Sequence, residues 1–191
     1  MFSDGVVDLV EKNVITSKYN TINPNKITST FVQGTKRLFD FIDHNDFVIM
    51  KEASFTNNEV NIRQNDRMVS INSAIEIDVT GQVCADSFGS KLYSGVGGQI
   101  DYVRGAVHSK NGKAIIAMPA VTAKGINKIV PALKTGAGVV TTRANIQYVV
   151  TEYGIAQLYG KNIKDRVKAM IDIAHPDFRE QIAKDYFELT R

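Results

Sequence analysis

The sequence predicts a single α/β domain whose strands form a mixed sheet. Short apolar runs typical of buried strands alternate along the chain with segments of helical periodicity. No linker-like stretch and no internal repeat divides residues 1–191, which we therefore treat as one domain. A chain of this length buries roughly 70% of the surface of its unfolded form, so its core needs no disulfide to hold it together.

The chain is predicted to begin with a helix. Ser3 is a suitable N-cap, Asp4 is favourable in a first helical turn, and residues 6–10 supply an apolar face. The polar residues 17–30 contain an Asn-Pro pair, so they predict a loop, with a short strand near residues 28–32.

The next segments supply a helix, a strand and a hairpin. Residues 36–45 repeat apolar side chains with a helical period, and the compact apolar run 47–52 predicts a buried strand. Apolar side chains alternate strongly through residues 68–88 on both sides of Thr80–Gly81. This pattern predicts a β-hairpin that turns at those two residues.

The last part of the chain combines strands with helices. Residues 94–106 begin as a glycine cluster and continue with a pattern compatible with a helix. Short apolar runs then predict strands at residues 113–120, 128–133 and 148–152. The final segment predicts two helices separated at His175–Pro176, because proline disfavours the continuation of a helix.

Composition excludes several classes of function. The net charge of +3 comes from dispersed basic residues, which argues against binding nucleic acid. The single cysteine, Cys84, excludes a disulfide or a cysteine metal cluster within one chain, and we expect it to pack in a strand. No metal site is expected, because His44, His108 and His175 lack the spacing of metal ligands and suit surface or capping positions. No apolar run approaches the roughly 18 residues of a membrane span and no signal peptide precedes the first helix, so we expect a cytoplasmic protein.

The most informative local feature is the segment GVGGQID at residues 95–101. Its three glycines in four residues let the backbone approach a ligand closely. A helix that follows them would point free amide groups at an anion or a developing oxyanion. The spacing matches neither a dinucleotide fingerprint nor a phosphate-binding P-loop. A purely structural turn between a strand and a helix is the alternative interpretation.

Acidic residues provide the second set of candidates. Glu152 ends a predicted buried strand just before Tyr153–Gly154, and ligands gather at such strand ends in open α/β sheets. A carboxylate there could orient a substrate or act as an acid or base, or it could simply cap a helix or form a salt bridge. Glu76 and Asp78 flank Ile77 in the predicted hairpin, and we expect both of them to be solvated.

A specific resemblance rests on five segments: SINSAIEIDVTGQV, SGVGGQIDYVRGA, KIVP, VVTEYGIAQLYGK and AHPDFRE. Together they resemble the C-terminal domain of the acetyl-CoA hydrolase/transferase family, in its order and over essentially the entire chain. The pattern is most similar to 4-hydroxybutyrate and butyryl-CoA:acetate CoA-transferases. The resemblance implies an open mixed sheet flanked by helices, as the C-terminal half of a two-domain enzyme whose N-terminal domain is absent from this chain.

The resemblance also implies a ping-pong transfer of CoA. A glutamate carboxylate attacks the acyl-CoA thioester, and the released CoA thiolate attacks the glutamyl carbonyl to give an enzyme–CoA thioester. An acceptor carboxylate then reverses these steps, with backbone donors stabilising each oxyanion. CoA is thus a substrate, and no covalently bound cofactor is implied. The implied partners are an acyl-CoA, a small carboxylate and the missing N-terminal domain, with a homodimer as a further candidate assembly.

Three positions match residues at the family's reacting centre. Gly97 and Gly98 match the loop beside the reacting carbonyl, so they are our candidates for amide donors. Glu152, in VTEYG, matches a family glutamate that lines the site and helps to position the carboxylate.

Other positions match residues that contact the substrate or CoA. Asn57, in FTNN, matches an asparagine near the thioester. Gly95 and Gln99 belong to the same glycine-rich loop and are assigned to CoA binding with it. Lys124, in TAKG, stands where some relatives place a lysine near the CoA phosphates.

The nucleophile is expected outside this sequence. The resemblance implies a glutamate at the end of a His-Thr-Glu type segment, and MFSDG at residues 1–5 matches the residues that come directly after that glutamate. The glutamate would therefore stand immediately before Met1, and Glu11, Glu52 and Glu76 do not match its place. We accordingly expect the separate chain to be inactive and to hold half of an active site.

Two alternative functions stay open from the sequence. The chain could be a CoA- or acyl-CoA-binding module without catalytic activity, or part of an acyl-CoA hydrolase in which water replaces the acceptor carboxylate. The acyl group, the acceptor and the choice between transfer and hydrolysis depend largely on the absent half.

Overall fold

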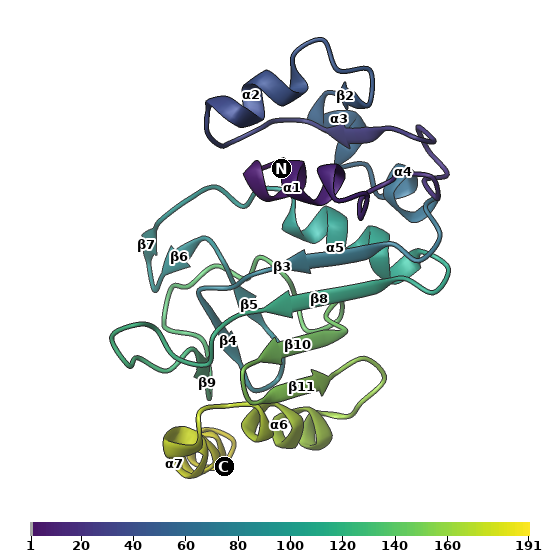
Figure 1. Ribbon diagram of the computed structural model, residues 1–191. Helices are drawn as coiled ribbons and strands as arrows, with labels where there is room; N and C mark the ends of the chain where they lie inside the picture. The colour runs from purple at the N-terminus through teal and green to yellow at the C-terminus, as the bar shows by residue number, and fades with distance from the viewer. Residues whose placement is uncertain (1) are drawn as a thin grey trace.

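Helices and strands intermingle along the chain, and the computed structural model describes residues 2–191 (Figure 1). The helices are α1 (Asp4–Glu11), α2 (Lys36–Ile42), α3 (Ala53–Thr56), α4 (Glu59–Arg63), α5 (Gln99–His108), α6 (Ile163–Asp172) and α7 (Pro176–Leu189). The strands are β1 (Ile27–Ser29), β2 (Val48–Met50), β3 (Val69–Asn72), β4 (Glu76–Asp78), β5 (Val83–Cys84), β6 (Ser87–Phe88), β7 (Lys91–Leu92), β8 (Lys113–Ala117), β9 (Ile129–Val130), β10 (Tyr148–Thr151) and β11 (Gly154–Gln157).

A mixed four-stranded sheet organises the structure, as predicted. Its order is β11-β10-β8-β3, with β3 and β10 parallel to β8 and β11 antiparallel to β10. Between β3 and β8 the chain first passes through β4 to β7 and then through α5, which packs against both strands. Smaller sheets contain β1 and β2, β5-β4-β9, and β6 and β7.

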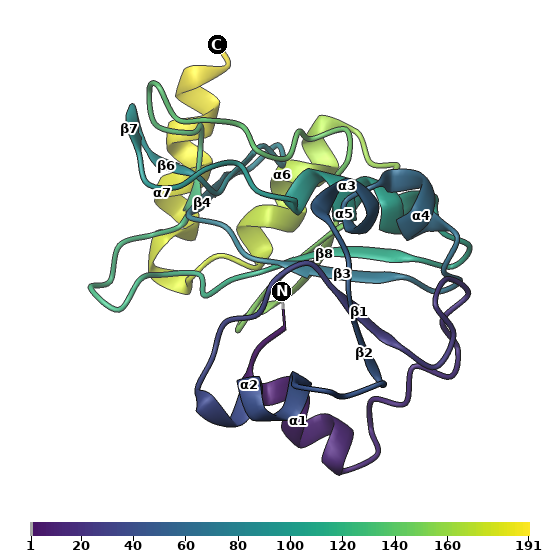
Figure 2. The same ribbon diagram turned by 90° about the horizontal axis from the view of Figure 1, so that it is seen from above.

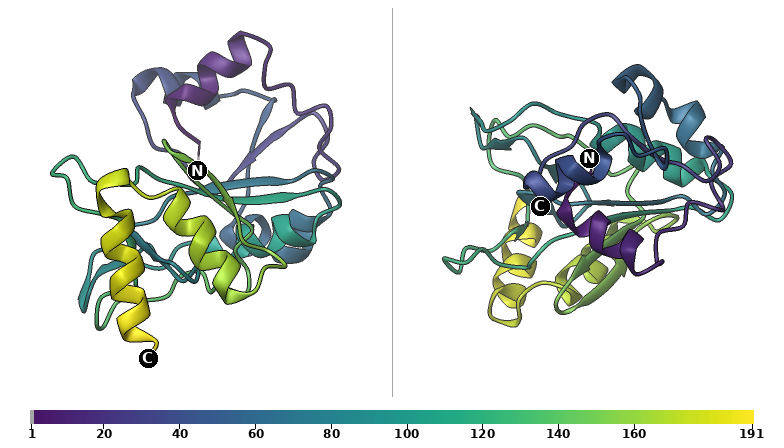
Figure 3. Two further views of the ribbon diagram at one scale, coloured as in Figure 1. Left: turned by 90° about the horizontal axis from the view of Figure 1, so that it is seen from below. Right: turned by 45° about the horizontal axis from the view of Figure 1, so that its top comes forward.

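Helices cover one face of the four-stranded sheet. Ile116 and Val149 point to this face and are buried, at 1% and 0% exposure, and α5 and α6 pack there. Figure 2 shows α3 to α6 on this side of the sheet, and Figure 3 shows α1 and α2 on the other side. On that other side Ile71 and Ile155 are 68% and 69% exposed. The sheet therefore keeps an apolar face that the described residues leave largely open.

The predicted hairpin forms, but two of its acidic residues are buried. Strands β4 and β5 pair in an antiparallel arrangement on either side of the turn at Thr80–Gly81. Asp78 is 7% exposed, and its Oδ1 accepts hydrogen bonds from the backbone N–H groups of residues 80–82. Glu76 is 2% exposed, and its carboxylate pairs with the Nζ of Lys134 at 3.1 Å. The expectation that Glu76 and Asp78 are solvated is therefore wrong, because β9 pairs along β4 and neighbouring segments enclose the hairpin.

The apolar run at residues 47–52 is less buried than predicted. It forms β2, but the burial of this strand is only partial and Met50 is 46% exposed. Among the described residues β2 pairs with β1 alone, so it lacks the neighbours that would enclose a central strand.

Cysteine and histidine residues take the places expected for them. Cys84 is fully buried in β5. His44 is exposed, the Nδ1 of His108 lies 2.7 Å from an oxygen of Glu59, and His175 caps α7 by accepting a backbone N–H. No group of three or more histidine, cysteine or acidic residues within residues 2–191 is arranged to hold a metal ion. No helix in that range has both the length and the apolar character needed to cross a membrane.

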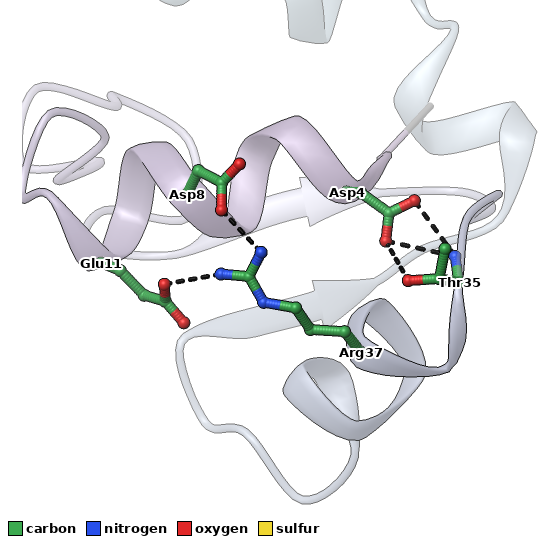
Figure 4. A network of polar contacts seen from close by, with 5 residues as sticks. All are labelled: Asp4, Asp8, Glu11, Thr35 and Arg37. Atoms are coloured by element: carbon green, nitrogen blue, oxygen red, sulfur yellow. Dashed lines mark hydrogen bonds and ion pairs between the residues drawn. The ribbon is translucent and has the colours of Figure 1, made fainter.

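Helix α1 begins at Asp4 as predicted, but the capping contacts differ. The side chain of Ser3 makes no capping hydrogen bond. The carboxylate of Asp4 instead accepts hydrogen bonds from the backbone N–H and the hydroxyl of Thr35, which precedes α2, at 3.1 and 2.7 Å. Arg37 of α2 reaches back to carboxylate oxygens of Asp8 and Glu11, both at 2.6 Å (Figure 4). These contacts link the first two helices.

The Asp4–Thr35 contact has a testable pH signature. The hydroxyl of Thr35, helped by its backbone N–H, holds the pKa of Asp4 below its usual range. Because the folded pKa is lowered, this contribution to stability is present above the unfolded pKa and is lost as the pH falls through the folded pKa. In an NMR titration we expect Thr35→Ala to raise the pKa of Asp4, whereas Thr35→Ser keeps it low. An unchanged titration in Thr35→Ala would contradict this assignment.

Candidate functional site

Several candidate residues lie along one edge of the four-stranded sheet. Strands β3, β8 and β10 run in the same direction, so their carboxyl ends meet at the left edge of the sheet in Figure 1. Glu152 directly follows β10, and Ser73 directly follows β3. Helix α5 begins at this edge, because the side chain of Gln99 contacts Ser73 there. Ligands bind at this edge in open α/β sheets.

The glycine-rich loop leads into the N-terminus of α5. Gly97 has a φ of +64°, a conformation that favours glycine, and Gly98 is the N-cap residue of the helix. Gly95 and Gly97 are exposed, and a Cβ added at either would meet nothing within 4 Å. Within residues 2–191 the N–H groups of Gly97 and Gly98 have no hydrogen-bond partner. The loop thus presents free amide donors at the positive end of a helix.

Asn57 packs directly against this loop. A Cβ placed on Gly98 would collide with the Nδ2 of Asn57, so the absence of a side chain at Gly98 permits the contact. The same Nδ2 donates to an oxygen of Asp101 at 3.4 Å, and the Oδ1 accepts the hydroxyl of Thr56 at 3.1 Å. Two candidates that are far apart in the sequence, Asn57 and Gly98, are therefore brought together.

Gln99 holds the loop in place. Its Nε2 donates to the backbone oxygen of Ser73 at 2.8 Å, and its Oε1 accepts the hydroxyl of Thr141 at 3.0 Å. Both polar groups of this side chain thus have partners inside the protein. Thr141 has no motif signal in the sequence, and only the fold reveals that it contacts the loop.

Glu152 is exposed, and the fold anchors one of its oxygens. Its Oε2 accepts a hydrogen bond from the backbone N–H of Ala120 at 2.9 Å. The backbone oxygen of Ala120 in turn accepts a hydrogen bond from the N–H of Lys128 at 2.9 Å. Burial lowers the pKa of Lys128, and the charge of Glu152 partly opposes this effect. The hydroxyl of Thr151 accepts the N–H of Tyr153 at 3.1 Å and so braces the turn. The second carboxylate oxygen of Glu152 makes no hydrogen bond within residues 2–191.

Lys124 lies apart from these contacts. It is exposed in the loop between β8 and β9, beside Gly125, which has a φ of +74°. The part of the chain that the structure describes makes no hydrogen bond or ion pair with its side chain. The structure therefore joins Asn57 to Gly98 by a direct contact, and Gln99 anchors the same loop to Ser73 and Thr141. It places Glu152 on the same sheet edge and does not connect Lys124 to these residues.

This arrangement suits the chemistry of an acyl group. Free backbone amides at a helix N-terminus stabilise the oxygen of a tetrahedral intermediate. The side-chain amide of Asn57 lies beside them, and the carboxylate of Glu152 has one unengaged oxygen. The sequence motifs point to the loop and to Glu152, but the partners Asp101, Ala120 and Lys128 emerge only from the fold.

Comparison with known proteins agrees with these features. Residues 34–186 match the family model described as "Acetyl-CoA hydrolase/transferase C-terminal domain". The chain is 55% identical to a succinyl-CoA:acetate/propanoyl-CoA:succinate CoA transferase of Fasciola hepatica, over 98% of this chain and 40% of that protein. It is 50% identical to a 4-hydroxybutyrate coenzyme A transferase of Clostridium kluyveri, over 97% of this chain and 44% of that protein.

The comparison with solved structures assigns the fold to the same family. The crystal structure of a 4-hydroxybutyrate CoA-transferase from Porphyromonas gingivalis superposes with a TM-score of 0.84 and 38% identity. That superposition covers 99% of this chain and 44% of the other. The chain thus spans less than half the length of the relatives that it matches.

Proposed function

The chain belongs to the acetyl-CoA hydrolase/transferase family as a C-terminal domain, and we propose that residues 1–191 form the CoA-facing half of a two-domain CoA-transferase. The substrates we propose are an acyl-CoA and a small carboxylate of the 4-hydroxybutyrate, butyrate or acetate type. The contact of Asn57 with Gly98, on the sheet edge that also holds Glu152, is the observation that best supports this function.

In the proposed reaction, a glutamate from the segment preceding Met1 attacks the thioester carbonyl. The carbon–sulfur bond breaks, which leaves an acyl–glutamyl anhydride and the CoA thiolate. The thiolate attacks the glutamyl carbonyl, releases the first carboxylate and forms an enzyme–CoA thioester. An acceptor carboxylate attacks that thioester, and the same steps in reverse give the new acyl-CoA.

The residues of this chain take supporting roles in that sequence. The free N–H groups of Gly97 and Gly98 stabilise the oxyanion of each tetrahedral intermediate. The side chain of Asn57 positions the thioester beside them. Glu152 helps to position the carboxylate, and Gly95 and Lys124 contribute to CoA binding, while Gln99 holds the loop that the CoA contacts.

The decisive experiment compares the 191-residue chain with a two-domain protein. The two-domain protein joins the N-terminal part of the Clostridium kluyveri relative to this chain. We expect the two-domain protein to transfer CoA between butyryl-CoA and acetate, and the separate chain to transfer none because it lacks the nucleophile. Robust turnover by the purified 191-residue chain would contradict the proposal.

Calorimetry with acetyl-CoA tests what the separate chain does by itself. We expect the 191-residue chain to bind acetyl-CoA weakly, with heat measurable at millimolar ligand, because the loop and Asn57 are already assembled. Tight binding by the separate chain, together with an inactive two-domain protein, would favour the binding-module alternative. Hydrolysis without transfer would favour the acyl-CoA hydrolase.

A further inference from the structure

Two polar neighbours hold the side chain of Asn57 at the N-terminus of α5. Its Oδ1 accepts a hydrogen bond from the hydroxyl of Thr56 at 3.1 Å, and its Nδ2 donates to the Oδ2 of Asp101 at 3.4 Å. Within residues 2–191 this side chain has no other hydrogen-bond partner. The reaction proposed above uses Asn57 but assigns no role to Asp101.

The backbone of Asn57 is fixed by the two short helices on either side of it. Its N–H donates to the backbone oxygen of Ala53 at 2.8 Å, so Asn57 ends α3 as its C-cap. The side chain of Asn61 in α4 donates to the backbone oxygen of Phe55 in α3 at 3.0 Å. Helices α3 and α4 are therefore tied together around this residue.

Close packing then fixes α4 on α5. A Cβ added at Gly105 of α5 would collide with the side chain of Ile62 in α4, so the glycine permits this approach. The Nδ1 of His108 in α5 also lies 2.7 Å from a carboxylate oxygen of Glu59 in α4. Figure 2 shows α3, α4 and α5 together on the covered side of the four-stranded sheet. With the backbone of Asn57 held in this way, the orientation of its side-chain amide is the remaining freedom.

The two ends of this amide differ in their hydrogen-bonding properties. Nδ2 carries two donors, whereas Oδ1 only accepts. A Cβ built on Gly98 would meet Nδ2 first, while Oδ1 lies farther away, at 3.6 Å. One N–H of Nδ2 bonds to Asp101, and the other has no partner within residues 2–191. This second N–H is therefore available beside the free N–H groups of Gly97 and Gly98.

Of the two neighbours, only Asp101 can distinguish the two orientations of the amide. The hydroxyl of Thr56 can donate or accept, so it can pair with either end. The carboxylate of Asp101 only accepts, so it bonds Nδ2 and repels Oδ1. Rotation of the amide by half a turn would place two acceptor oxygens against each other and break a hydrogen bond. Asp101 therefore selects the orientation in which Nδ2 lies beside Gly98.

The charge of Asp101 extends into the cluster around Thr56. Burial raises the pKa of Tyr102, the hydroxyl of Thr56 partly opposes this effect, and the charge of Asp101 adds to the increase. The phenol, the hydroxyl and the carboxylate thus lie near one another. Residues 101 and 102 of α5 together contact the end of α3 that carries Asn57.

A reversed amide would oppose the proposed reaction. Negative charge develops on the carbonyl oxygen when a thioester is attacked, and N–H donors stabilise it. A reversed Asn57 would turn Oδ1 toward the loop and repel that charge. The repulsion is greater in the transition state than in the bound substrate, so the orientation affects kcat more than KM.

We propose that Asp101 is a positioning residue for the transfer reaction: its carboxylate holds the side-chain amide of Asn57 with Nδ2 toward the glycine loop. This inference rests on the proposed function, in which Asn57 positions the thioester. Asp101 acts through Asn57 and does not itself contact the substrate.

NMR spectroscopy of the 191-residue chain tests the orientation without any substrate. We expect a nuclear Overhauser effect between the side-chain amide protons of Asn57 and the α protons of Gly98. In Asp101→Ala its intensity should fall to about half or less, because the remaining hydroxyl of Thr56 pairs with either end of the amide. Thr56→Val should keep the effect, since Asp101 still selects Nδ2.

Helix α6 supplies a matched control for this substitution. Asp165 is the third residue of α6, as Asp101 is of α5, and both helices have ten residues. Its Oδ2 likewise accepts a side-chain amide N–H, from Asn162 at 2.8 Å. Asp165→Ala therefore removes the same kind of bond and the same first-turn charge elsewhere in the fold. We expect it to leave the effect between Asn57 and Gly98 unchanged.

Kinetics of the two-domain enzyme test whether the reaction uses this orientation. With butyryl-CoA and acetate, we expect Asp101→Ala to lower kcat about 10-fold and to change the KM for butyryl-CoA by less than about twofold. A merely structural role of Asp101 would loosen the loop and raise this KM as well. In the Asn57→Ala background, Asp101→Ala should cause no further loss. Asp165→Ala should keep the full kcat.

The more conservative Asp101→Asn guards against a variant that fails to fold. It keeps the size of the side chain but adds donors, so it pairs with either orientation of Asn57. We expect changes in the same direction as in Asp101→Ala, in both the NMR and the kinetic measurement. Thermal unfolding of each variant shows that the fold is kept.

Three outcomes would overturn the proposal. They are an unchanged Overhauser effect in both Asp101 variants, full kcat in both, and a further loss of kcat when Asp101→Ala is added to Asn57→Ala. The NMR measurement needs no catalysis. A two-domain protein that transfers no CoA would therefore refute the proposed function, while the spectra still decide whether Asp101 orients Asn57.

Discussion

Glu152→Ala in the two-domain enzyme is expected to lower kcat by about 100-fold or more while the fold stays intact. The side chain is exposed, and its Oε2 accepts a single hydrogen bond, from the N–H of Ala120. Its removal therefore costs little stability but deletes a negative charge from the sheet edge where the reaction is proposed to occur. Steady-state kinetics with butyryl-CoA and acetate, together with thermal unfolding, measure the two effects separately.

Two further variants show how Glu152 acts. Glu152→Gln keeps an oxygen that can accept the N–H of Ala120, so it retains the geometry and removes the charge. If the negative charge of Glu152 takes part in the reaction, we expect Glu152→Gln to lose nearly as much activity as Glu152→Ala. If the glutamate only braces the turn, we expect Glu152→Gln to keep nearly full activity. Glu180→Ala, at an exposed position on α7, is the control for general effects of removing a carboxylate. Unchanged activity in Glu152→Ala would remove this residue from the site.

Gly98→Ala is expected to lower kcat/KM by about 100-fold, because small misplacements of reacting groups have effects of this size. The backbone of Gly98 has a φ of −93°, which any residue adopts, so the substitution introduces no backbone strain. Its Cβ would instead collide with the side-chain amide of Asn57 and push this residue away from the loop. The same kinetic assay in the two-domain enzyme measures the loss.

The glycine loop provides a matched control. Gly95→Ala adds the same methyl group where nothing lies within 4 Å and φ is not positive. Because Gly95 is proposed to contribute to CoA binding, we expect a much smaller loss than in Gly98→Ala, seen in the KM for butyryl-CoA and not in kcat. If the loss in Gly98→Ala acts through Asn57, the double variant with Asn57→Ala should be no worse than Asn57→Ala alone. Equal activities of Gly98→Ala and Gly95→Ala would show that the contact with Asn57 plays no part in the reaction.

Local patterns in the sequence predicted much of the secondary structure. Alternation around Thr80–Gly81 predicted the hairpin, and the proline at position 176 predicted the break between α6 and α7. Runs of apolar residues predicted β8 and β10. These predictions succeed because periodicity, glycine and proline act on the backbone over only a few residues.

The family resemblance went further than these local patterns. It added Asn57 and Lys124 to the candidates that local patterns had already offered, the glycine loop and Glu152, and it named the fold that the comparisons confirm. The roles of these residues stay predictions, which the substitutions above test.

Tertiary structure alone decided which residues meet. The expectation of solvated Glu76 and Asp78 failed because β9 and the surrounding loops, which are distant in sequence, enclose the hairpin. The contact of Asn57 with Gly98 and the bond from Ala120 to Glu152 join segments 41 and 32 residues apart, respectively. Local propensity acts over a few residues, whereas burial and contact depend on which distant segments the sheet brings side by side.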